Sequence, residues 1–291
     1  MSKWSETIER HRPGLLAVIM GVLLLFCVGL AGWLVVARGG ASQEGVEVLQ
    51  DIREKKLPAF WGEEAVSLWY LYTDPNGKAV GWWTRTRGPA GKGYQGKRIE
   101  QVGSSFLREV WQVDRTGRIS QYLARASAIV RRPGTRIPLL QPISTTSILL
   151  RDGQVEVRQT GLQITQAAKA SAPGNYIPEG LNDLAYYQAS LDERRAAFTL
   201  VINDAAVNRG RLHFTSITVV PEGRGKVLLS TQIADGDAKE RLEFDSKGEV
   251  LRGGSPGGRY SFERSTFDLV KKAFPEVELF VRREAEDSQV D

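Results

Sequence analysis

The stretch VSLWYLYTDPNGKAVGWW, residues Val66–Trp83, determines how this chain must fold. At its centre, Asp74–Gly77 has the composition of a β-hairpin turn. Asp opens such a turn through its side chain, Pro presets the backbone angle, and Gly adopts the positive φ that closes it. The runs on either side are rich in aromatic and β-branched residues, which favour strands. The stretch therefore predicts two antiparallel strands joined by a tight turn.

Large side chains occur on both faces of this predicted hairpin. With the turn in this place, Trp69 lies opposite Trp83 and Tyr70 lies opposite Trp82, and the two pairs occupy opposite faces. One face must pack on the core, and the other must be covered by a helix, a partner or a ligand. We expect helix 181–193 to cover it, with an apolar ligand as the alternative. In that alternative the candidate ligand-binding residues are Trp69, Tyr70, Trp82, Trp83 and Trp111.

Three further turns repeat the same chemistry along the chain, at Asp114–Gly117, Asp152–Gly153 and Asp245–Gly248. Each lies between apolar or alternating runs, which is typical of consecutive hairpins. The expected fold is mainly β within the α+β class, an antiparallel meander or curved half-barrel sheet with one or two packed helices. The predicted strands cover residues 66–73, 78–87, 94–102, 106–113, 118–130, 145–151, 154–160, 195–203, 211–220, 226–234, 238–244, 249–253 and 258–263.

Two helices and two irregular segments complete the expected domain. Apolar residues recur at helical spacing over 181–193. A short helix follows Ser265, its predicted N-cap, and ends before Pro275. The segment 131–144 contains three prolines and is expected to be a long connection. The acidic tail 284–291 is expected to be disordered.

An uncharged run of 24 residues, 14–37, precedes this domain. At about 1.5 Å per residue a helix of this length reaches about 36 Å, enough to cross a hydrocarbon core of about 30 Å. The run is longer than the apolar core of a cleaved signal peptide, so we expect a retained transmembrane helix. Lys3, Arg10 and Arg12 precede it, and the positive-inside rule then leaves the N-terminus in the cytoplasm.

These features divide the chain into five parts. Residues 1–13 are expected to form a cytoplasmic tail, 14–37 the span of the inner (plasma) membrane, and 38–58 a juxtamembrane linker with an amphipathic helix. Residues 59–283 are expected to form an extracytoplasmic, periplasmic domain that precedes the tail 284–291. The lipid bilayer is therefore an expected partner.

The composition narrows the chemistry that the domain can perform. The net charge of +5 comes from 39 basic and 34 acidic residues without a dense basic block, so no nucleic-acid partner is expected. The single cysteine, Cys27, lies within the predicted span, which leaves no cysteine nucleophile outside it. His213 stands alone on a predicted strand, without a nucleophile elbow. We therefore expect a non-enzymatic domain with no metal and no cofactor, while paired carboxylates leave glycoside hydrolysis open.

The segment 88–98, GPAGKGYQGKR, contains a G-x-G-x-x-G and most of a G-x-x-x-x-G-K phosphate loop. Such motifs bind phosphate where a strand enters the loop and a helix leaves it. Here both flanking runs look like strands, and no helical period follows Gly96. The loop then lacks the helix dipole and the free N–H groups that hold a phosphate. We expect a mobile basic hairpin loop instead.

The succession of strand and turn segments resembles two known families. The segments are WYLYTDPNGKAVGWW, EVWQVDRTGRISQY, ILLRDGQVEV, YIPEGL and RLEFDSKGEVLR, within residues 60–265. Their order resembles the antiparallel domain that precedes the catalytic part of some bacterial transglutaminase-like proteins. It is also similar to the LolA/LolB half-barrels that carry lipoproteins across the envelope. No Cys-His-Asp module follows here, so the resemblance implies a β-rich envelope domain and an expected binding of lipid or lipoprotein.

Three functions are compatible with these observations. The first is a non-enzymatic module that binds a lipid, an acyl chain or a lipoprotein in the concave face of its sheet. The second is an envelope protein–protein interaction or scaffold domain with no small ligand, in which helix 181–193 fills the concavity. The third is a carboxylate-based hydrolase, which a buried carboxylate pair in a cleft would favour.

Overall fold

The structure is a computed structural model, and it describes residues 40, 42–131, 138–161, 165–201, 207–208, 211–233, 236–255 and 258–287. The predicted membrane span 14–37 and the cytoplasmic tail 1–13 lie outside these residues. Within the described ranges, no helix combines the length and the apolar character needed to cross a membrane.

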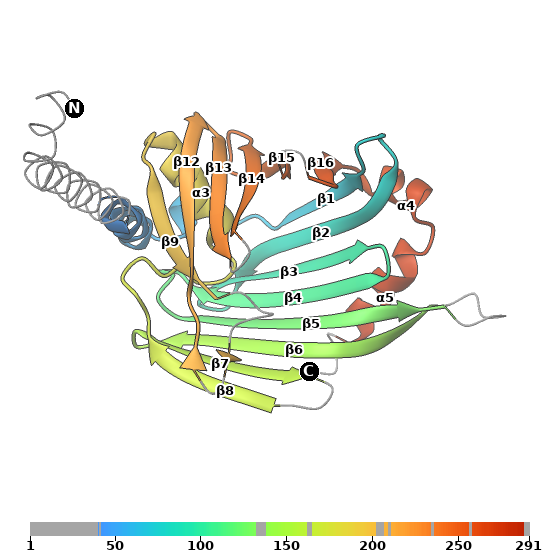
Figure 1. Cartoon of the computed structure of the whole chain (residues 1–291), viewed down its shortest axis with the longest axis horizontal. Helices are drawn as coiled ribbons and strands as arrows, with labels where there is room; N and C mark the ends of the chain where they lie inside the picture. The colour runs from blue at the N-terminus through green and yellow to red at the C-terminus, as the bar shows by residue number, and fades with distance from the viewer. Residues whose placement is uncertain are drawn as a thin grey trace, which may run out of the picture.

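Among the described residues, fourteen antiparallel strands form one large sheet (Figure 1). The strands are β1 Val66–Thr73, β2 Ala79–Ala90, β3 Gly93–Val102, β4 Ser105–Asp114, β5 Ser120–Val130, β6 Leu139–Arg151, β7 Gln154–Gly161, β8 Thr165–Ser171, β9 Ala196–Leu200, β12 Thr215–Gly223, β13 Lys226–Ile233, β14 Gly236–Phe244, β15 Val250–Gly254 and β16 Ser261–Ser265. A separate two-stranded ribbon joins β10 Val207–Asn208 to β11 Arg211–Leu212. The prediction of a mainly β, antiparallel sheet with few helices is confirmed.

The sheet consists of two sequential runs that meet at one seam. The first run is β1 to β8 and the second is β9 followed by β12 to β16, each strand pairing with the next. The seam pairs β1 with β16, where Trp69 lies opposite Ser265. The edge of β9 is bordered by the connector that follows β8, because Ile177 N donates to Thr199 O at 2.8 Å.

The register of the β1–β2 hairpin differs from the prediction by one residue. The turn forms as predicted, with Asp74 N donating to Lys78 O and Gly77 at a φ of 78°. The register then shifts at Tyr72/Thr73, so Tyr70 pairs with Trp83 and Leu71 with Trp82. The predicted pairings of Trp69 with Trp83 and of Tyr70 with Trp82 are therefore wrong. The cause is an irregularity in β2 that the turn sequence does not encode.

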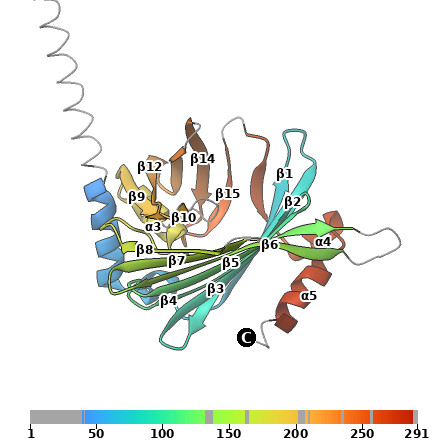
Figure 2. The same ribbon diagram turned by 60° about the horizontal axis from the view of Figure 1, so that its bottom comes forward.

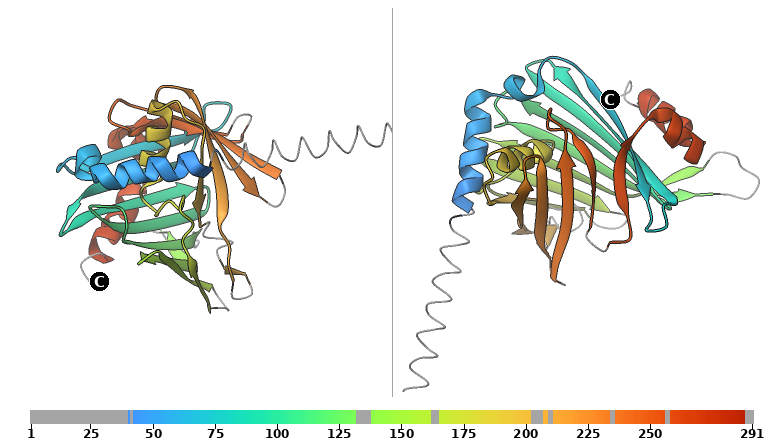
Figure 3. Two further views of the ribbon diagram at one scale, coloured as in Figure 1. Left: turned by 90° about the vertical axis from the view of Figure 1, so that its left-hand side faces the viewer. Right: turned by 90° about the horizontal axis from the view of Figure 1, so that it is seen from above.

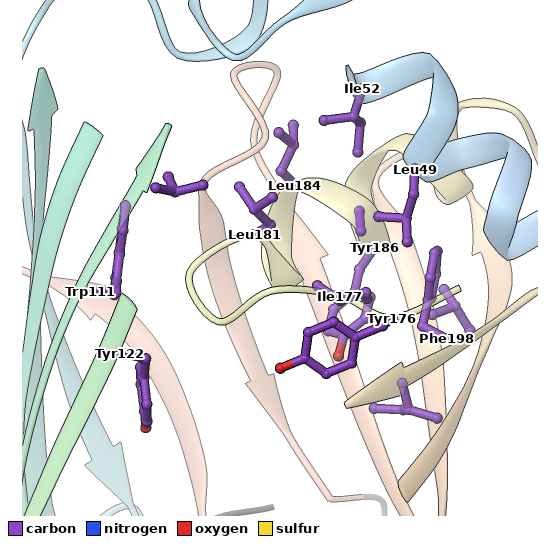
Figure 4. Close-up of a cluster of buried hydrophobic side chains, with 14 of the residues drawn as sticks. Leu49, Ile52, Trp111, Tyr122, Tyr176, Ile177, Leu181, Leu184, Tyr186 and Phe198 are labelled. Atoms are coloured by element: carbon purple, nitrogen blue, oxygen red, sulfur yellow. The ribbon is translucent and has the colours of Figure 1, made fainter. Parts of the chain in front are cut away.

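The inner face of the sheet, which carries Tyr70 and Trp83, packs on the protein's own helices. These are α3, Asn182–Leu191, and the amphipathic helix 42–55, which lies across one end of the sheet (Figure 3). Their buried side chains gather with those of the connector and β9, opposite Trp111 and Tyr122 (Figure 4). The helix predicted at 181–193 thus packs on the inner face of the sheet, against β12 and β13.

The outer face, which carries Trp69 and Trp82, is covered at one end by the two C-terminal helices (Figure 2). These are α4, Phe267–Ala273, and α5, Val277–Asp287. Phe280 packs on Phe106 with ring centroids 5.1 Å apart, and Trp82 is fully buried beneath the same helix. Both faces of the β1–β2 hairpin are therefore covered by this chain itself.

Three expectations at the ends of elements are wrong. Residues 139–144 continue β6 instead of forming a connection, and Pro142 is tolerated because it lies beside the register shift at Ala126/Ser127. Helix α4 is capped by Thr266 and not by Ser265. Residues 284–287 belong to α5, where a disordered tail was expected, and 288–291 lie outside the described residues.

The outer cluster predicts a specific loss of stability when its central ring is removed. Phe280→Ala should lower the free energy of unfolding by about 3 kcal/mol, because it leaves a cavity against Trp82 and Phe106. Leu279→Ala, on the same helix but 38% exposed, should change it by less than about 1 kcal/mol. Urea unfolding followed by tryptophan fluorescence measures both, and equal losses would contradict the packing described.

Candidate ligand-binding trough

A trough of about 1240 Å³ lies along the first run of strands, beside the end that α4 and α5 cover. The strand register places its lining on the outer face, because side chains in register across a sheet share a face. One registered row crosses six strands and consists of Thr86, Lys97, Val110, Leu123, Ser147 and Arg158.

A second registered row runs beside the first and gives the trough a polar rim. Gln95, Gln112 and Gln121 lie in register on β3, β4 and β5, and all three are exposed. Leu149 follows them on β6. Each amide offers both a donor and an acceptor, so this rim suits the polar part of a ligand.

The floor of the trough is apolar between Lys97 and Arg108 at one end and Arg158 at the other. Val110, Leu123 and Leu149 are half-buried and adjoin one another across β4, β5 and β6. Lys97 is half-buried at one end, and Arg108, at 8% exposure, lies beside it. The arrangement is that of an amphipathic site with a positive end.

The glycines in residues 88–98 have structural roles, in a turn and in a close contact between strands. Gly91, at a φ of 55°, makes the turn between β2 and β3. Gly96 lies against Trp111, whose ring would be 2.0 Å from a Cβ at that position. The prediction that no helix leaves this loop is confirmed, since it joins two antiparallel strands. A smaller cavity of about 450 Å³ borders the same turn and shares Gln112 and Gln121 with the trough.

The inner face carries arginines that are matched by carboxylates. Arg85 pairs with Asp183 in the first turn of α3, and Arg87 Nη2 lies 2.5 Å from Glu249 Oε1. These two pairs tie β2 to α3 and to the second run of strands. The carboxylates raise the pKa of Arg85 although burial opposes them, whereas burial lowers the pKa of Arg87 despite Glu249.

Arg98, the third inner arginine, lies between two glutamates. Its Nη2 is 2.5 Å from Glu100 Oε2, its Nε is 3.8 Å from Glu109 Oε2, and its guanidinium stacks over Trp83. Burial would lower the pKa of Arg98, but Glu100 and Glu109 outweigh burial and raise it. An arginine placed between two glutamates favours a structural network over acid–base chemistry. In the part of the chain that the structure describes, no group of three or more His, Cys, Asp or Glu is placed to hold a metal ion.

The five candidate residues named from the sequence are not brought together on one face. Trp69 and Trp82 lie under α4 and α5 on the outer face, whereas Tyr70, Trp83 and Trp111 belong to the inner core. Only Trp111 borders the trough. Sequence reasoning missed Lys97, Arg108, Val110 and Leu123, although their alternation with inward residues on β3 to β5 marks them as outward-facing.

The comparisons with known proteins give matches only among solved structures. No family model matches the sequence, and curated proteins give no match either. Among solved structures, the chain is similar to a beta-barrel-like protein of a domain of unknown function, DUF1849, from Brucella abortus. The identity is 11%, the alignment covers 68% of this chain and 94% of that one, and the TM-score is 0.43.

A buried carboxyl beneath the trough makes the stability of the domain depend on pH. Glu179, in the connector before α3, is buried and accepts from the Tyr176 hydroxyl at 3.0 Å. Burial raises its pKa from 4.5 to about 7. A carboxyl with a raised native pKa binds its proton more tightly when folded, so stability falls as pH rises between these two values.

Glu179→Gln should therefore remove a pH-dependent loss of stability. Between pH 4.5 and about pH 7 the natural chain should lose about 3 kcal/mol, at 1.36 kcal/mol per pH unit, and the variant should not. Thermal unfolding at a series of pH values measures this difference. Glu64→Gln, at an exposed position, is the control and should keep the natural profile. Parallel profiles for all three chains would contradict the assignment.

Proposed function

We propose that this chain is a membrane-anchored envelope protein that binds an elongated amphipathic ligand, such as a lipid or an acyl chain, in the outer-face trough. The observation that carries the proposal is the apolar floor of Val110, Leu123 and Leu149 between a cationic end and a glutamine rim. Ligand pockets typically measure about 300 to 1,000 Å³ and combine an apolar lining with a few polar groups. The trough, at about 1240 Å³, is large enough for such a ligand.

The trough differs in position from the concave site that the sequence suggested. The concave face is filled by α3, by the connector and by helix 42–55, with Tyr176, Ile177 and Leu181 almost fully buried. A ligand of the proposed size therefore finds its space on the outer face. The scaffold alternative, in which another envelope protein docks in the trough, differs in that no small amphiphile would bind there.

The anchor part of the proposal rests on the predicted span 14–37 and on the helix that follows it. Helix 42–55 buries Val48, Leu49 and Ile52 in the inner core, so it is an integral part of the domain. Only residues 38–41 separate it from the predicted span. A linker of this length would keep the domain close to the bilayer surface.

Photo-crosslinking tests the binding proposal directly. The full chain in nanodiscs of phosphatidylcholine should be irradiated with palmitate that carries a diazirine on its chain, and the adducts mapped by peptide mass spectrometry. We expect adducts on peptides from β4 to β6 that contain Val110, Leu123 and Leu149. Leu123→Asp should reduce them about tenfold or more, because it places a charge in the apolar floor.

Leu228→Asp provides the matched control for that experiment. Leu228 is also a half-buried leucine that faces away from the core, but it lies on β13 in the second run of strands. This variant should keep the trough adducts. Adducts confined to residues 14–37, or equally reduced in both variants, would refute the binding proposal.

Protease protection tests the proposed location. In intact spheroplasts, added protease should digest residues 38–291 and leave the N-terminal peptide shielded, since the positive-inside rule places residues 1–13 in the cytoplasm. Immunoblotting with one tag at each terminus reads out both ends. Survival of the large domain until lysis would place it in the cytoplasm and contradict the envelope proposal.

A further inference from the structure

We propose that the outer edge of β8 is a docking surface for a second copy of this chain, which joins the two sheets through an antiparallel β8–β8 pair. Among the described residues, β8 pairs with β7 on one side and forms the end of the large sheet on the other (Figure 1). No residue of β8 lines the trough, so this inference does not depend on the proposed function. It rests on the hydrogen-bonding groups, the regularity and the symmetry of the edge.

The backbone groups that point away from β7 can be identified from one hydrogen bond. Ala172 N donates to Gly153 O at 2.8 Å, directly beyond the end of β8. Because N–H and C=O groups alternate in direction along an antiparallel strand, those of the even-numbered residues of β8 face β7. The odd-numbered residues direct their N–H and C=O groups to the outer edge, and these are Thr165, Ala167, Lys169 and Ser171.

The edge of β8 lacks most of the features that prevent an exposed strand from pairing. Natural sheets usually protect such edges with proline, bulges, charges or a covering segment. β8 contains no proline, and its register against β7 continues without a shift from Thr165 to Ser171. Its single charged residue, Lys169, lies in register with Glu156 of opposite sign on β7. The edge is therefore regular enough to accept a further strand.

The opposite edge of the sheet, at β9, is covered by the chain itself. Thr199 N donates to Asn175 O at 2.9 Å, and Ile177 N donates to Thr199 O at 2.8 Å. The ribbon β10–β11 lies close to β8, but it is a separate sheet whose Val207 and Leu212 join the inner core. Within the described ranges, the chain thus covers one end of its sheet and leaves the other end open to pairing.

The edge of β8 is complementary to itself. A two-fold axis through Ala168 pairs every outward-directed residue with another outward-directed residue of the second copy. Ala167 then lies opposite Lys169 of the second copy, and all seven residues of β8 take part. An axis through Lys169 would place two like charges directly opposite each other, which is destabilising. An axis through Ala167 would pair fewer residues, so overlap and charge together favour the axis through Ala168.

A second copy also satisfies the geometry of a closed assembly. Antiparallel pairing of identical strands forms an isologous two-fold dimer, in which each copy uses the same edge and none is left to extend the sheet. The seven residues of β8 are fewer than the about 20 to 30 residues a side of a standard interface. We therefore expect a weak and reversible dimer, for which covalent trapping is the suitable measurement.

Cysteine cross-linking tests the dimer. On the outer edge Ala168 forms a non-hydrogen-bonded pair with itself, whose Cα atoms lie about 4.5 Å apart, within the about 4.4 to 6.8 Å that a disulfide spans. Ala168→Cys in a Cys27→Ser chain should therefore give a disulfide-linked dimer. The full chain should be oxidised with copper phenanthroline in phosphatidylcholine vesicles and analysed by non-reducing electrophoresis. A chain that stays monomeric under these conditions would overturn the proposal.

Two further cysteine positions test the register. The axis through Ala168 separates the two copies of Thr165 by about 20 Å, so Thr165→Cys alone should remain monomeric. The same holds for Ser171→Cys alone. Reconstituted together, these two variants should cross-link to each other, because Thr165 lies opposite Ser171 of the second copy. Cross-linking of Thr165→Cys with itself as strong as that of Ala168→Cys would indicate random collision and refute the pairing.

A backbone variant tests whether the edge hydrogen bonds hold the dimer together. Lys169→Pro removes one outward N–H and leaves the hydrogen bonds to β7 in place, so it should reduce cross-linking through Ala168→Cys about fivefold or more. Lys169→Ala keeps the N–H and should retain the cross-linking, which makes it the matched control. Circular dichroism verifies that both variants fold, and equal cross-linking by the two folded variants would contradict pairing through this edge.

Discussion

The β1–β2 hairpin is apolar on both faces, and the rest of the fold depends on how each face is covered. On one face Tyr70 and Trp83 stack with their ring centroids 3.6 Å apart. On the other face the ring centroids of Trp69 and Trp82 are 6.0 Å apart. A sheet with water on one side would leave one of these pairs exposed at a large cost in free energy. The inner pair packs against Phe262 of β16, with the Arg98 guanidinium over Trp83, and the outer pair packs against Phe267 of α4 and Phe280 of α5. The trough lies on the outer face of the first run of strands.

Charge is distributed between the two faces according to what covers them. Arginines that face the interior are matched by carboxylates from α3, from the β14–β15 turn and from β3 and β4. Breaking a buried pair costs about 3 to 5 kcal/mol, so the Arg87–Glu249 pair helps to hold the two runs of strands together. Alternation along β3 and β4 thus directs Arg98 toward the inner carboxylates and places Lys97 and Arg108 along the trough.

Much of the fold was predictable, because local chemistry determines it. The Asp-initiated turns gave the hairpins, and strands β1 to β7 agree with the predicted ranges within a few residues except at the start of β6. β8, with the sequence TQAAKAS, was missed because its small side chains lack the β-branched and aromatic signal. α5 was missed although Val277, Phe280 and Val281 have helical spacing. The trough was not predictable, because alternation identifies the outward residues but not the curvature that makes their face hollow.

The seam between β1 and β16 has a consequence for how the chain reaches its native state. Thr73 and Ser261 contact each other across 188 positions, so the sheet joins its first strand to its last. Until β16 is available, β1 presents an unpaired edge of aromatic strand, which is a template for wrong pairing. Pairing over such a sequence separation is slow, because the entropy cost of closing the long loop comes before any stabilising contact forms. During synthesis, the β1 edge of the first run of strands therefore remains unpaired until nearly the whole domain has emerged.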